Sequence, residues 1–168
     1  MSIFTIGYEG ADVAAFVQTL LRAGVRTVAD VRAVAVSRRK GFSKTALAHH
    51  LSDAGIAYVH FRDLGDPKPG REAARAGRMR EFESIYSAHM NTAAAQIQLA
   101  ELAQLSGTGD VALLCYEADA LGCHRTMIAR SIAKSKKSAI VHLSVNNQSA
   151  SIGRSRTHDH PCEGLAAA

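Results

Sequence analysis

The feature that most constrains the fold is the regular alternation of short apolar runs, rich in β-branched residues, with amphipathic segments of helical spacing. The apolar runs predict strands over residues 3–6, 27–31, 56–61, 111–115 and 139–143. The amphipathic segments predict helices over residues 12–23, 44–54, 78–105 with a break near Asn91, and 123–136. Strands that alternate with helices form parallel sheets covered on both faces. The pattern therefore predicts an α/β fold, a three-layer sandwich around a mainly parallel sheet of about five strands.

The length of 168 residues suits one domain with a sizeable core. We expect this domain to cover residues 1–143. Ser, Asn, Gly and basic residues dominate afterwards, which predicts a flexible C-terminal tail over residues 144–168. A long segment, residues 62–77, contains Asp66-Pro67-Lys68-Pro69-Gly70, which is expected to continue neither a helix nor a strand. We interpret this segment as a loop and a candidate lid.

The composition indicates which kinds of partner the protein binds, but it does not indicate an activity. The chain has 47% hydrophobic residues and a net charge of +5, which excludes a disordered or fibrous protein and favours anionic partners, either a small molecule or nucleic acid. Its three cysteines are odd in number and unevenly spaced, so they form no disulfide framework, and a reducing cytoplasm fits best. Because no apolar run approaches about 18 residues, we expect no membrane partner.

Charged residues stand at the predicted carboxyl ends of the strands, where ligands bind in open parallel sheets. The segments concerned are Gly7-Tyr8-Glu9-Gly10, Asp30-Val31-Arg32, His60-Phe61-Arg62 and Cys115-Tyr116-Glu117. The following helix begins with Cys123-His124-Arg125, at a helix N-terminus that favours an anion. We expect these groups to converge at one site.

These segments, taken with Ser37-Arg38, Gly41-Phe42-Ser43 and Leu64-Gly65, resemble the domain of unknown function 488 family over roughly residues 2–143. The resemblance implies a small α/β protein of bacterial type and supplies no reaction. The family pattern carries a second glycine after Leu64-Gly65, where this chain has Asp66. This departure bears on the conformation of the candidate lid.

Four residues are candidates for catalysis: Glu9, Glu117, Cys123 and His124. A helix N-terminus and the neighbouring Arg125 both lower a thiol pKa, which favours Cys123 as a nucleophile. Its alternative role is that of a small buried residue, and Arg125 follows it too closely to form a phosphatase-like loop. His124 is a candidate general acid or base, or else a packing histidine.

The two glutamates are candidates for proton transfer. With Asp30 they offer a carboxylate cluster of the kind that binds Mg²⁺. The alternative is that Asp30 and Glu117 orient Arg32 and Arg125 by ion pairing, which we prefer for Asp30. We therefore assign no metal site, and the cofactor is left unspecified.

Four further residues are candidates for substrate binding: Tyr8, Arg32, Arg38 and Arg125. A guanidinium can hold a phosphate or carboxylate by two-point contact. For Arg125 the alternative is a salt bridge to Glu117 or Asp119, and for Tyr8 it is packing across a loop.

The first hypothesis is an enzyme of unspecified reaction that binds an anionic, phosphate-bearing substrate, a nucleotide or nucleic acid, at the carboxyl edge of the sheet. The alternative is a non-catalytic nucleic-acid-binding module that uses two basic loops, in residues 32–52 and 62–80. A third hypothesis, a regulatory thiol pair of Cys115 and Cys123, is disfavoured because Cys115 ends a strand that reads as buried.

Overall fold

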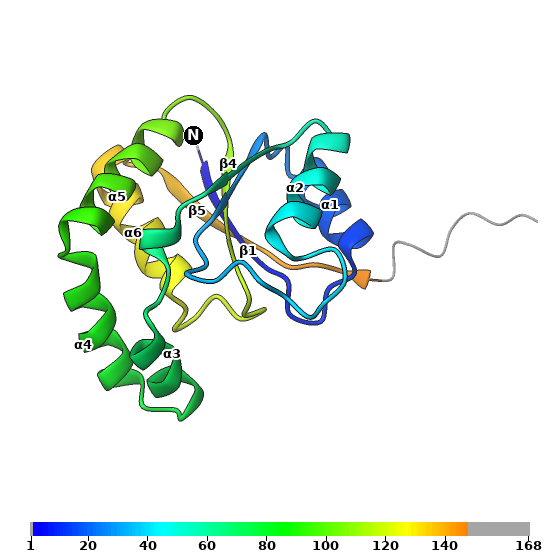
Figure 1. Ribbon diagram of the computed structural model, residues 1–168. Helices are drawn as coiled ribbons and strands as arrows, with labels where there is room; N and C mark the ends of the chain where they lie inside the picture. The colour runs from blue at the N-terminus through cyan, green and yellow to red at the C-terminus, as the bar shows by residue number, and fades with distance from the viewer. Residues whose placement is uncertain (1, 148–168) are drawn as a thin grey trace, which may run out of the picture.

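The computed structural model describes residues 2–147, which form one five-stranded sheet with the order β3-β2-β4-β1-β5 (Figure 1). All neighbouring strands are parallel. The strands are β1 (Ser2–Gly7), β2 (Thr27–Asp30), β3 (Ala57–His60), β4 (Val111–Cys115) and β5 (Ala139–Leu143). The predicted α/β fold around a parallel sheet is confirmed.

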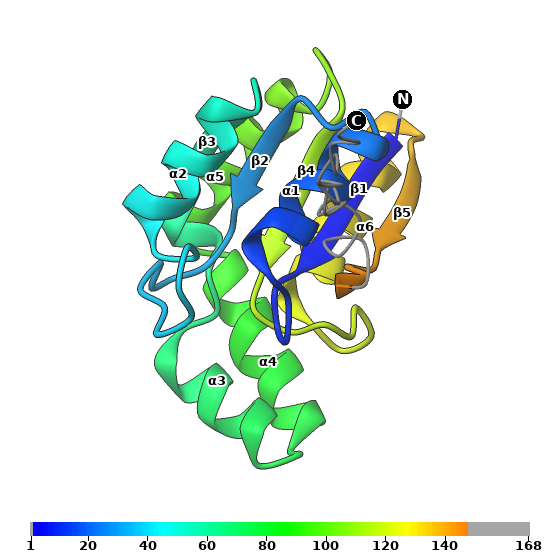
Figure 2. The ribbon, with the colours of Figure 1, turned by 90° about the vertical axis from the view of Figure 1, so that its right-hand side faces the viewer.

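Helices cover both faces of the sheet, as a three-layer sandwich requires (Figures 1 and 2). One face carries α1 (Val13–Arg22) and α2 (Lys44–Asp53). The other carries α4 (Met79–Met90), α5 (Ala93–Leu105) and α6 (His124–Lys136). The predicted break near Asn91 separates α4 from α5. A short helix, α3 (Lys68–Arg75), and part of α4 extend beyond the carboxyl ends of the strands.

Local sequence explains where α1 begins and ends. Asp12 is its N-cap, and the carboxylate accepts hydrogen bonds from the backbone N–H groups of Ala14 and Ala15 at 2.8 and 3.2 Å. Gly24, just past the end, has φ +71, which a glycine adopts without steric cost. Between these signals, Phe16 and Leu20 are buried on the face that packs against the sheet.

The alternation of side chains along β4 decides which residues face which helices. Val111 and Leu113 belong to the core that includes α6, whereas Ala112 and Leu114 belong to the core that includes α1 and α2. Cys115 continues the first series, so its thiol lies on the α6 face. The whole strand is buried, as the sequence predicted.

The interpretation of residues 62–77 as a loop was partly wrong. Residues Arg62–Leu64 form a 3₁₀ turn, η1, and Lys68–Arg75 form α3. Pro69 lies in the first turn of α3, where a backbone N–H has no partner within the helix. The prolines are therefore compatible with a helix that starts at Lys68.

The first residues of the expected tail pack onto the domain. Val145 packs against the core that includes α1 and α2, and the Asn147 side chain accepts from the Asp12 N–H at 3.0 Å and donates to the Gly10 carbonyl at 2.9 Å. The remainder of the expected tail, residues 148–168, lies outside the described residues. Among the described residues, no helix combines the length and apolar character needed to cross a membrane.

Candidate functional site

The candidate site lies where the connections leaving two adjacent strands diverge. β1 and β4 are neighbours, but the chain leaves β1 towards α1 on one face and leaves β4 towards α6 on the other. Such a switch point is where open parallel sheets bind ligands. The two loops are tied together, because the Tyr8 and Glu9 N–H groups donate to the Tyr116 carbonyl at 3.1 and 2.8 Å.

Glu9 braces the loop that follows β4. Its carboxylate accepts a hydrogen bond from the Ala118 N–H at 3.1 Å, while the residue itself stays exposed. This contact gives Glu9 a structural role in positioning the loop, and its role in proton transfer stays a prediction.

Five side chains at this edge form what we call the sulfur cluster: Cys115, Glu117, Cys123, His124 and Arg125. The two Sγ atoms lie 2.9 Å apart, within hydrogen-bonding distance. Glu117 Oε2 lies 2.9 Å from Cys115 Sγ and 3.3 Å from Cys123 Sγ, so it can accept a hydrogen bond from either residue when that residue is a thiol. The cysteines and His124 are buried, whereas Glu117 is exposed and forms the solvent side of the cluster.

Arg125 is the fully buried cation of the cluster, with 1% of its surface exposed. Its Nη1 donates to Cys115 Sγ at 2.7 Å, to Cys123 Sγ at 3.4 Å and to the Glu117 carbonyl. Its Nη2 donates to the Ala118 carbonyl at 3.1 Å. The guanidinium therefore holds both sulfurs and the loop after β4 in one arrangement.

His124 joins the cluster to the end of β2. Its Nε2 lies 2.9 Å from the Val31 carbonyl, and its Nδ1 lies 3.8 Å from Cys123 Sγ. Donation from Nε2 to the carbonyl directs Nδ1 to the sulfur. The ring also packs edge-on against Tyr86, with 5.7 Å between centroids.

These contacts separate the two thiols electrostatically. The hydrogen bond from Cys115, together with His124, lowers the pKa of Cys123 to about 5 despite its burial. Burial and the contact with Cys123 raise the pKa of Cys115 well above its ordinary value. Burial alone would lower the pKa of His124, but the Cys123 sulfur outweighs it and raises that pKa. These shifts favour a thiolate at Cys123, a protonated thiol at Cys115 and a protonated ring at His124.

Glu117 stays ionised beside this thiolate. Although the residue is exposed, partial desolvation of its carboxyl group raises the Glu117 pKa; the hydrogen bonds that the carboxylate accepts, first of all from Cys115, outweigh this effect and lower the pKa. An ionised Glu117 is therefore available as a proton acceptor for the Cys115 thiol, which lies 2.9 Å away.

Asp66 and Tyr86 also border the cluster, and the sequence did not single them out as site residues. Asp66 is 6% exposed and its Oδ1 has no hydrogen-bond partner. Burial raises its pKa to about 6, against the opposing charges of His124 and Arg71. Asp66 stands where the family pattern has a second glycine, and this departure was the sequence signal that could have identified it. No local sequence pattern distinguishes Tyr86 from the other residues of α4.

A second polar group lies on the opposite face of the sheet edge, beside α1 and α2. Asp30 and Arg32 form a buried ion pair with two hydrogen bonds, at 2.8 and 2.6 Å. Arg32 Nη1 also donates to the Tyr8 hydroxyl at 3.1 Å and to the Phe42 carbonyl at 2.8 Å. The expected pairing of Asp30 with Arg32 is therefore present.

The charged strand ends consequently form two groups rather than one. Of the four residues predicted to bind substrate, Tyr8, Arg32 and Arg125 are buried and hydrogen-bonded within the protein. Arg38 lies exposed on the loop between β2 and α2. Tyr8 stacks on Phe42 with 4.6 Å between ring centroids, which is the packing role that the sequence left open.

Four members of the sulfur cluster offer donor atoms of the kinds that zinc prefers. One atom each from Cys115, Glu117, Cys123 and His124 lies within 4.8 Å of the others. Two sulfurs at about 2.3 Å from a tetrahedral zinc ion stand roughly 3.8 Å apart. The observed 2.9 Å and the Arg125 hydrogen bonds fit a thiol pair better than zinc coordination.

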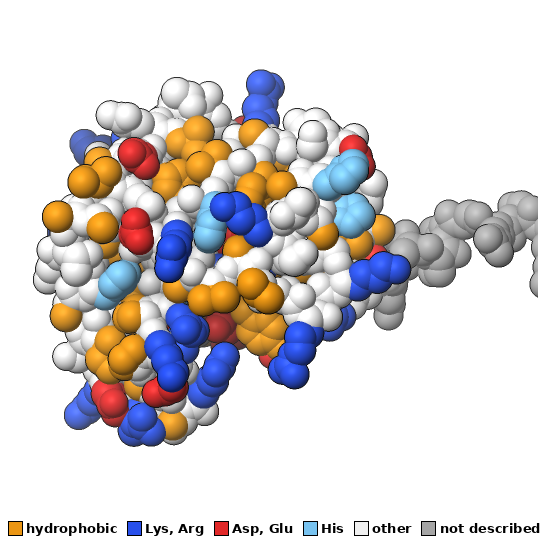
Figure 3. Space-filling view, viewed as in Figure 1, with side chains coloured by type: hydrophobic (Ala, Val, Ile, Leu, Met, Phe, Trp, Pro, Cys, Tyr) orange, Lys and Arg blue, Asp and Glu red, His pale blue; other side chains and the backbone are white. Residues whose placement is uncertain are grey.

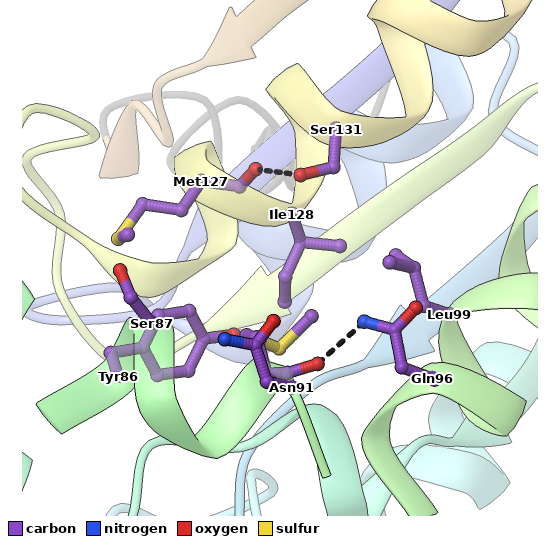
Figure 4. Close-up of a pocket in the computed structure, with 9 residues that line it drawn as sticks. Tyr86, Ser87, Asn91, Gln96, Leu99, Met127, Ile128 and Ser131 are labelled. Atoms are coloured by element: carbon purple, nitrogen blue, oxygen red, sulfur yellow. Dashed lines mark hydrogen bonds between the residues drawn. The ribbon is translucent and has the colours of Figure 1, made fainter. Parts of the chain in front are cut away.

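A shallow hollow of about 270 Å³ lies elsewhere, between α4, α5 and α6 (Figure 4). Apolar side chains such as Leu99, Met127 and Ile128 line it, along with amide and hydroxyl groups. Tyr86 is the one titratable group among its lining residues, and burial raises the Tyr86 pKa. The hollow therefore lacks the proton-transfer groups found at the sulfur cluster.

The fold and the cluster together define a parallel α/β protein with a paired-thiol site at the carboxyl edge of its sheet. The family model described as "Domain of unknown function DUF488" matches residues 12–132, and the chain belongs to that family. The resemblance found in the sequence is thereby confirmed. Searches of curated proteins and of solved structures found no match.

Proposed function

We propose that this protein is an enzyme in which the Cys123 thiolate attacks an anionic, phosphate-bearing substrate at the carboxyl edge of the sheet. The observation that carries the proposal is the surroundings of Cys123 Sγ. A thiol lies at 2.9 Å, a guanidinium N–H at 3.4 Å and an imidazole nitrogen at 3.8 Å. These groups stabilise a thiolate, the reactive form of a cysteine nucleophile.

The neighbouring groups supply the proton transfers that such an attack needs. As the Cys123 sulfur forms its bond to the substrate, the bond to the leaving group breaks, and the leaving group takes the proton that His124 carries. Arg125 is the positioning residue, because its donors are directed to the sulfurs and to the loop carbonyls. Glu117, on the solvent side, is placed to accept a proton from an incoming nucleophile such as water.

The charge around the edge supports an anionic substrate. The loops after β2 and β3 meet where Gly65 packs against Ala33, and exposed cations lie on both of them. Figure 3 shows Lys and Arg side chains gathered around α3, at the end of the molecule to which the strands point. The exposed cations include Arg38 and Lys40 after β2, Arg62 after β3, and Lys68 and Arg75 on α3.

The proposal is tested by the rate at which Cys123 reacts with iodoacetamide as a function of pH, in a Cys162→Ser background and with peptide mapping of the adduct. We expect the midpoint of the rate profile near pH 5 in place of the ordinary value of about 8.5. Cys115→Ala removes the hydrogen bond and should raise the midpoint, whereas Cys115→Ser keeps a donor and should raise it less.

The substrate class is tested by protection from the same reagent. Inorganic phosphate, sulfate, nucleotides and short oligonucleotides are added in turn, with and without Mg²⁺, and Arg38→Ala is compared with wild type. Saturable protection by a phosphate-bearing compound that weakens in Arg38→Ala is the expected result. An ordinary thiol midpoint together with no saturable protection contradicts the proposal.

The exposed cations on two adjoining loops also favour a second candidate, a non-catalytic nucleic-acid-binding module. In that case oligonucleotide affinity should fall steeply with salt, and Arg38→Ala with Lys40→Ala should reduce the slope. Affinity should then be indifferent to Cys123→Ser. A flat salt response removes this candidate.

A further inference from the structure

The sulfur cluster contains a second thiol, Cys115, which stabilises the Cys123 thiolate by a hydrogen bond but forms no bond to the substrate in the proposed reaction. Cys115 ends β4 and is fully buried, and its register opposite Gly7 of β1 fixes its backbone. Cys123 is 6% exposed and precedes the first residue of α6. The two residues are eight positions apart in sequence, and their sulfurs are 2.9 Å apart in space.

We infer that Cys115 and Cys123 are a redox-active pair, in which Cys123 is oxidised by a hydroperoxide and Cys115 then closes a disulfide with it. The pair is a modification site distinct from substrate turnover. Only its consequence for activity, loss of the nucleophile, rests on the proposed function.

The first step uses the same thiolate as the proposed reaction. The Cys123 sulfur attacks the terminal oxygen of the hydroperoxide, and the O–O bond breaks. Cys123 becomes a sulfenic acid, and the departing oxygen takes a proton from the His124 imidazolium to leave as water or an alcohol. The oxidant is thereby reduced by two electrons, which come from the Cys123 sulfur.

The second step requires Cys115 to lose its proton, and Glu117 is placed to receive it. Glu117 Oε2 accepts from the Cys115 thiol at 2.9 Å. As Cys115 transfers this proton, its sulfur attacks the Cys123 sulfur and the S–O bond breaks. The hydroxide released takes the proton from Glu117 and leaves as water, so the net products are a disulfide, water and the reduced oxidant.

Burial favours closure over further oxidation. Cys115 is shielded from direct attack by an oxidant, yet it already contacts the sulfur that becomes the sulfenic acid. The attack is therefore intramolecular and needs a movement of under about 1 Å to reach an S–S bond length of about 2.05 Å. The hydrogen bonds from Arg125 to the Glu117 and Ala118 carbonyls do not involve the sulfurs. We therefore expect Arg125 to hold the loop after β4 in place when the disulfide forms.

The test uses the full chain with Cys162→Ser, treated with stoichiometric hydrogen peroxide, quenched with N-ethylmaleimide and analysed by mass spectrometry. We expect the loss of two hydrogen atoms, a peptide linking Cys115 to Cys123, and restoration of both thiols by dithiothreitol. In Cys115→Ser the sulfenic acid should persist and be trapped by dimedone. In Cys123→Ser the reaction with peroxide should slow at least tenfold.

Two results overturn the inference: conversion of Cys123 directly to sulfinic acid in the protein that retains Cys115, or thiols that stay free under peroxide. Both are read from protein without substitutions at the pair, so a variant that fails to fold does not obscure them. No substrate enters the assay, which separates the inference from the proposed function. A low thiol midpoint without a disulfide removes the inference alone, and a disulfide without ligand protection removes only the substrate proposal.

Discussion

Gly7 lies against the carbonyl oxygen of Glu117, and a Cβ atom at Gly7 would come to 1.7 Å from that oxygen. The same carbonyl accepts a hydrogen bond from Arg125 Nη1. The absence of a side chain at the end of β1 therefore permits the loop after β4 to approach closely enough for Arg125 to hold it. This contact explains why the sequence carries a glycine there and how a residue of β1 supports a site built from β4 and α6.

Substitution of Gly7 by alanine should damage both the fold and the thiol site. We expect the free energy of unfolding to fall by more than about 2 kcal/mol, because backbone must move to admit the methyl group. Urea denaturation measures this change. Gly109→Ala is the matched control, since nothing lies within 4 Å of a Cβ atom there, and it should change stability by less than about 0.5 kcal/mol. Equal effects of the two substitutions would show that the Gly7 contact is unimportant.

The buried pair of Asp30 and Arg32 should contribute strongly to stability when one partner is removed. Asp30→Asn leaves a guanidinium that is 5% exposed without its counter-charge, and we expect a loss of about 3–5 kcal/mol in unfolding free energy. Tyr58→Phe removes one hydrogen bond to Asp30, at 2.6 Å, and should cost about 1 kcal/mol.

The control for this pair is on the surface. Arg78 and Glu81 also form a contact of 2.6 Å, but their side chains are 53% and 50% exposed. Glu81→Gln should therefore cost under about 1 kcal/mol. If Asp30→Asn costs no more than Glu81→Gln in thermal or urea denaturation, the ion pair is not a structural anchor.

Sequence periodicity predicted the strands and most helices because each of them buries a continuous apolar face. It did not predict α3, because prolines usually interrupt helices. The local sequence does not show that Pro69 lies in the first turn of α3, where a proline is tolerated. The sequence also placed Cys115, Glu117 and Cys123 at one edge. It did not separate Asp30 from them, because assigning the two faces requires knowing which helices cover each face. Asp66 and Tyr86 reach the site through long-range packing, which no local pattern encodes.

Asp66 should make the protein less stable at neutral pH than an asparagine would. Its pKa is raised by burial from 3.8 to about 6, so between these values the folded chain binds more protons than the unfolded chain. Stability attributable to Asp66 therefore falls as pH rises from about 4 to about 6, and the cost persists above that window. We expect Asp66→Asn to raise the free energy of unfolding by about 1–2 kcal/mol at pH 7.5, a value reduced for partial solvation.

The pH dependence distinguishes this effect from a change in packing. The stabilisation by Asp66→Asn should disappear below about pH 4, where Asp66 is protonated in both states. Urea denaturation at a series of pH values measures it, with Asp63→Asn as the control for an acid on the neighbouring 3₁₀ turn. A stabilisation that is the same at pH 4 and pH 7.5 would contradict the electrostatic origin.

His124 should hold the Cys123 thiolate through charge. Its Nδ1 lies 3.8 Å from the Cys123 sulfur, and this contact lowers the pKa of Cys123 and raises the pKa of His124. In His124→Asn the thiolate keeps the Cys115 hydrogen bond but loses its positive neighbour, so the pKa of Cys123 should rise by at least about one unit. Iodoacetamide reactivity against pH measures this rise, and the ultraviolet absorbance of the thiolate gives an independent reading. His89→Asn, on α4, is the control and should leave the midpoint in place.

An unchanged midpoint in His124→Asn would mean that Cys115 and Arg125 alone stabilise the thiolate. The proton for the leaving group would then have to come from another acid. Asp66 is the candidate, because its pKa of about 6 keeps it partly protonated near neutral pH.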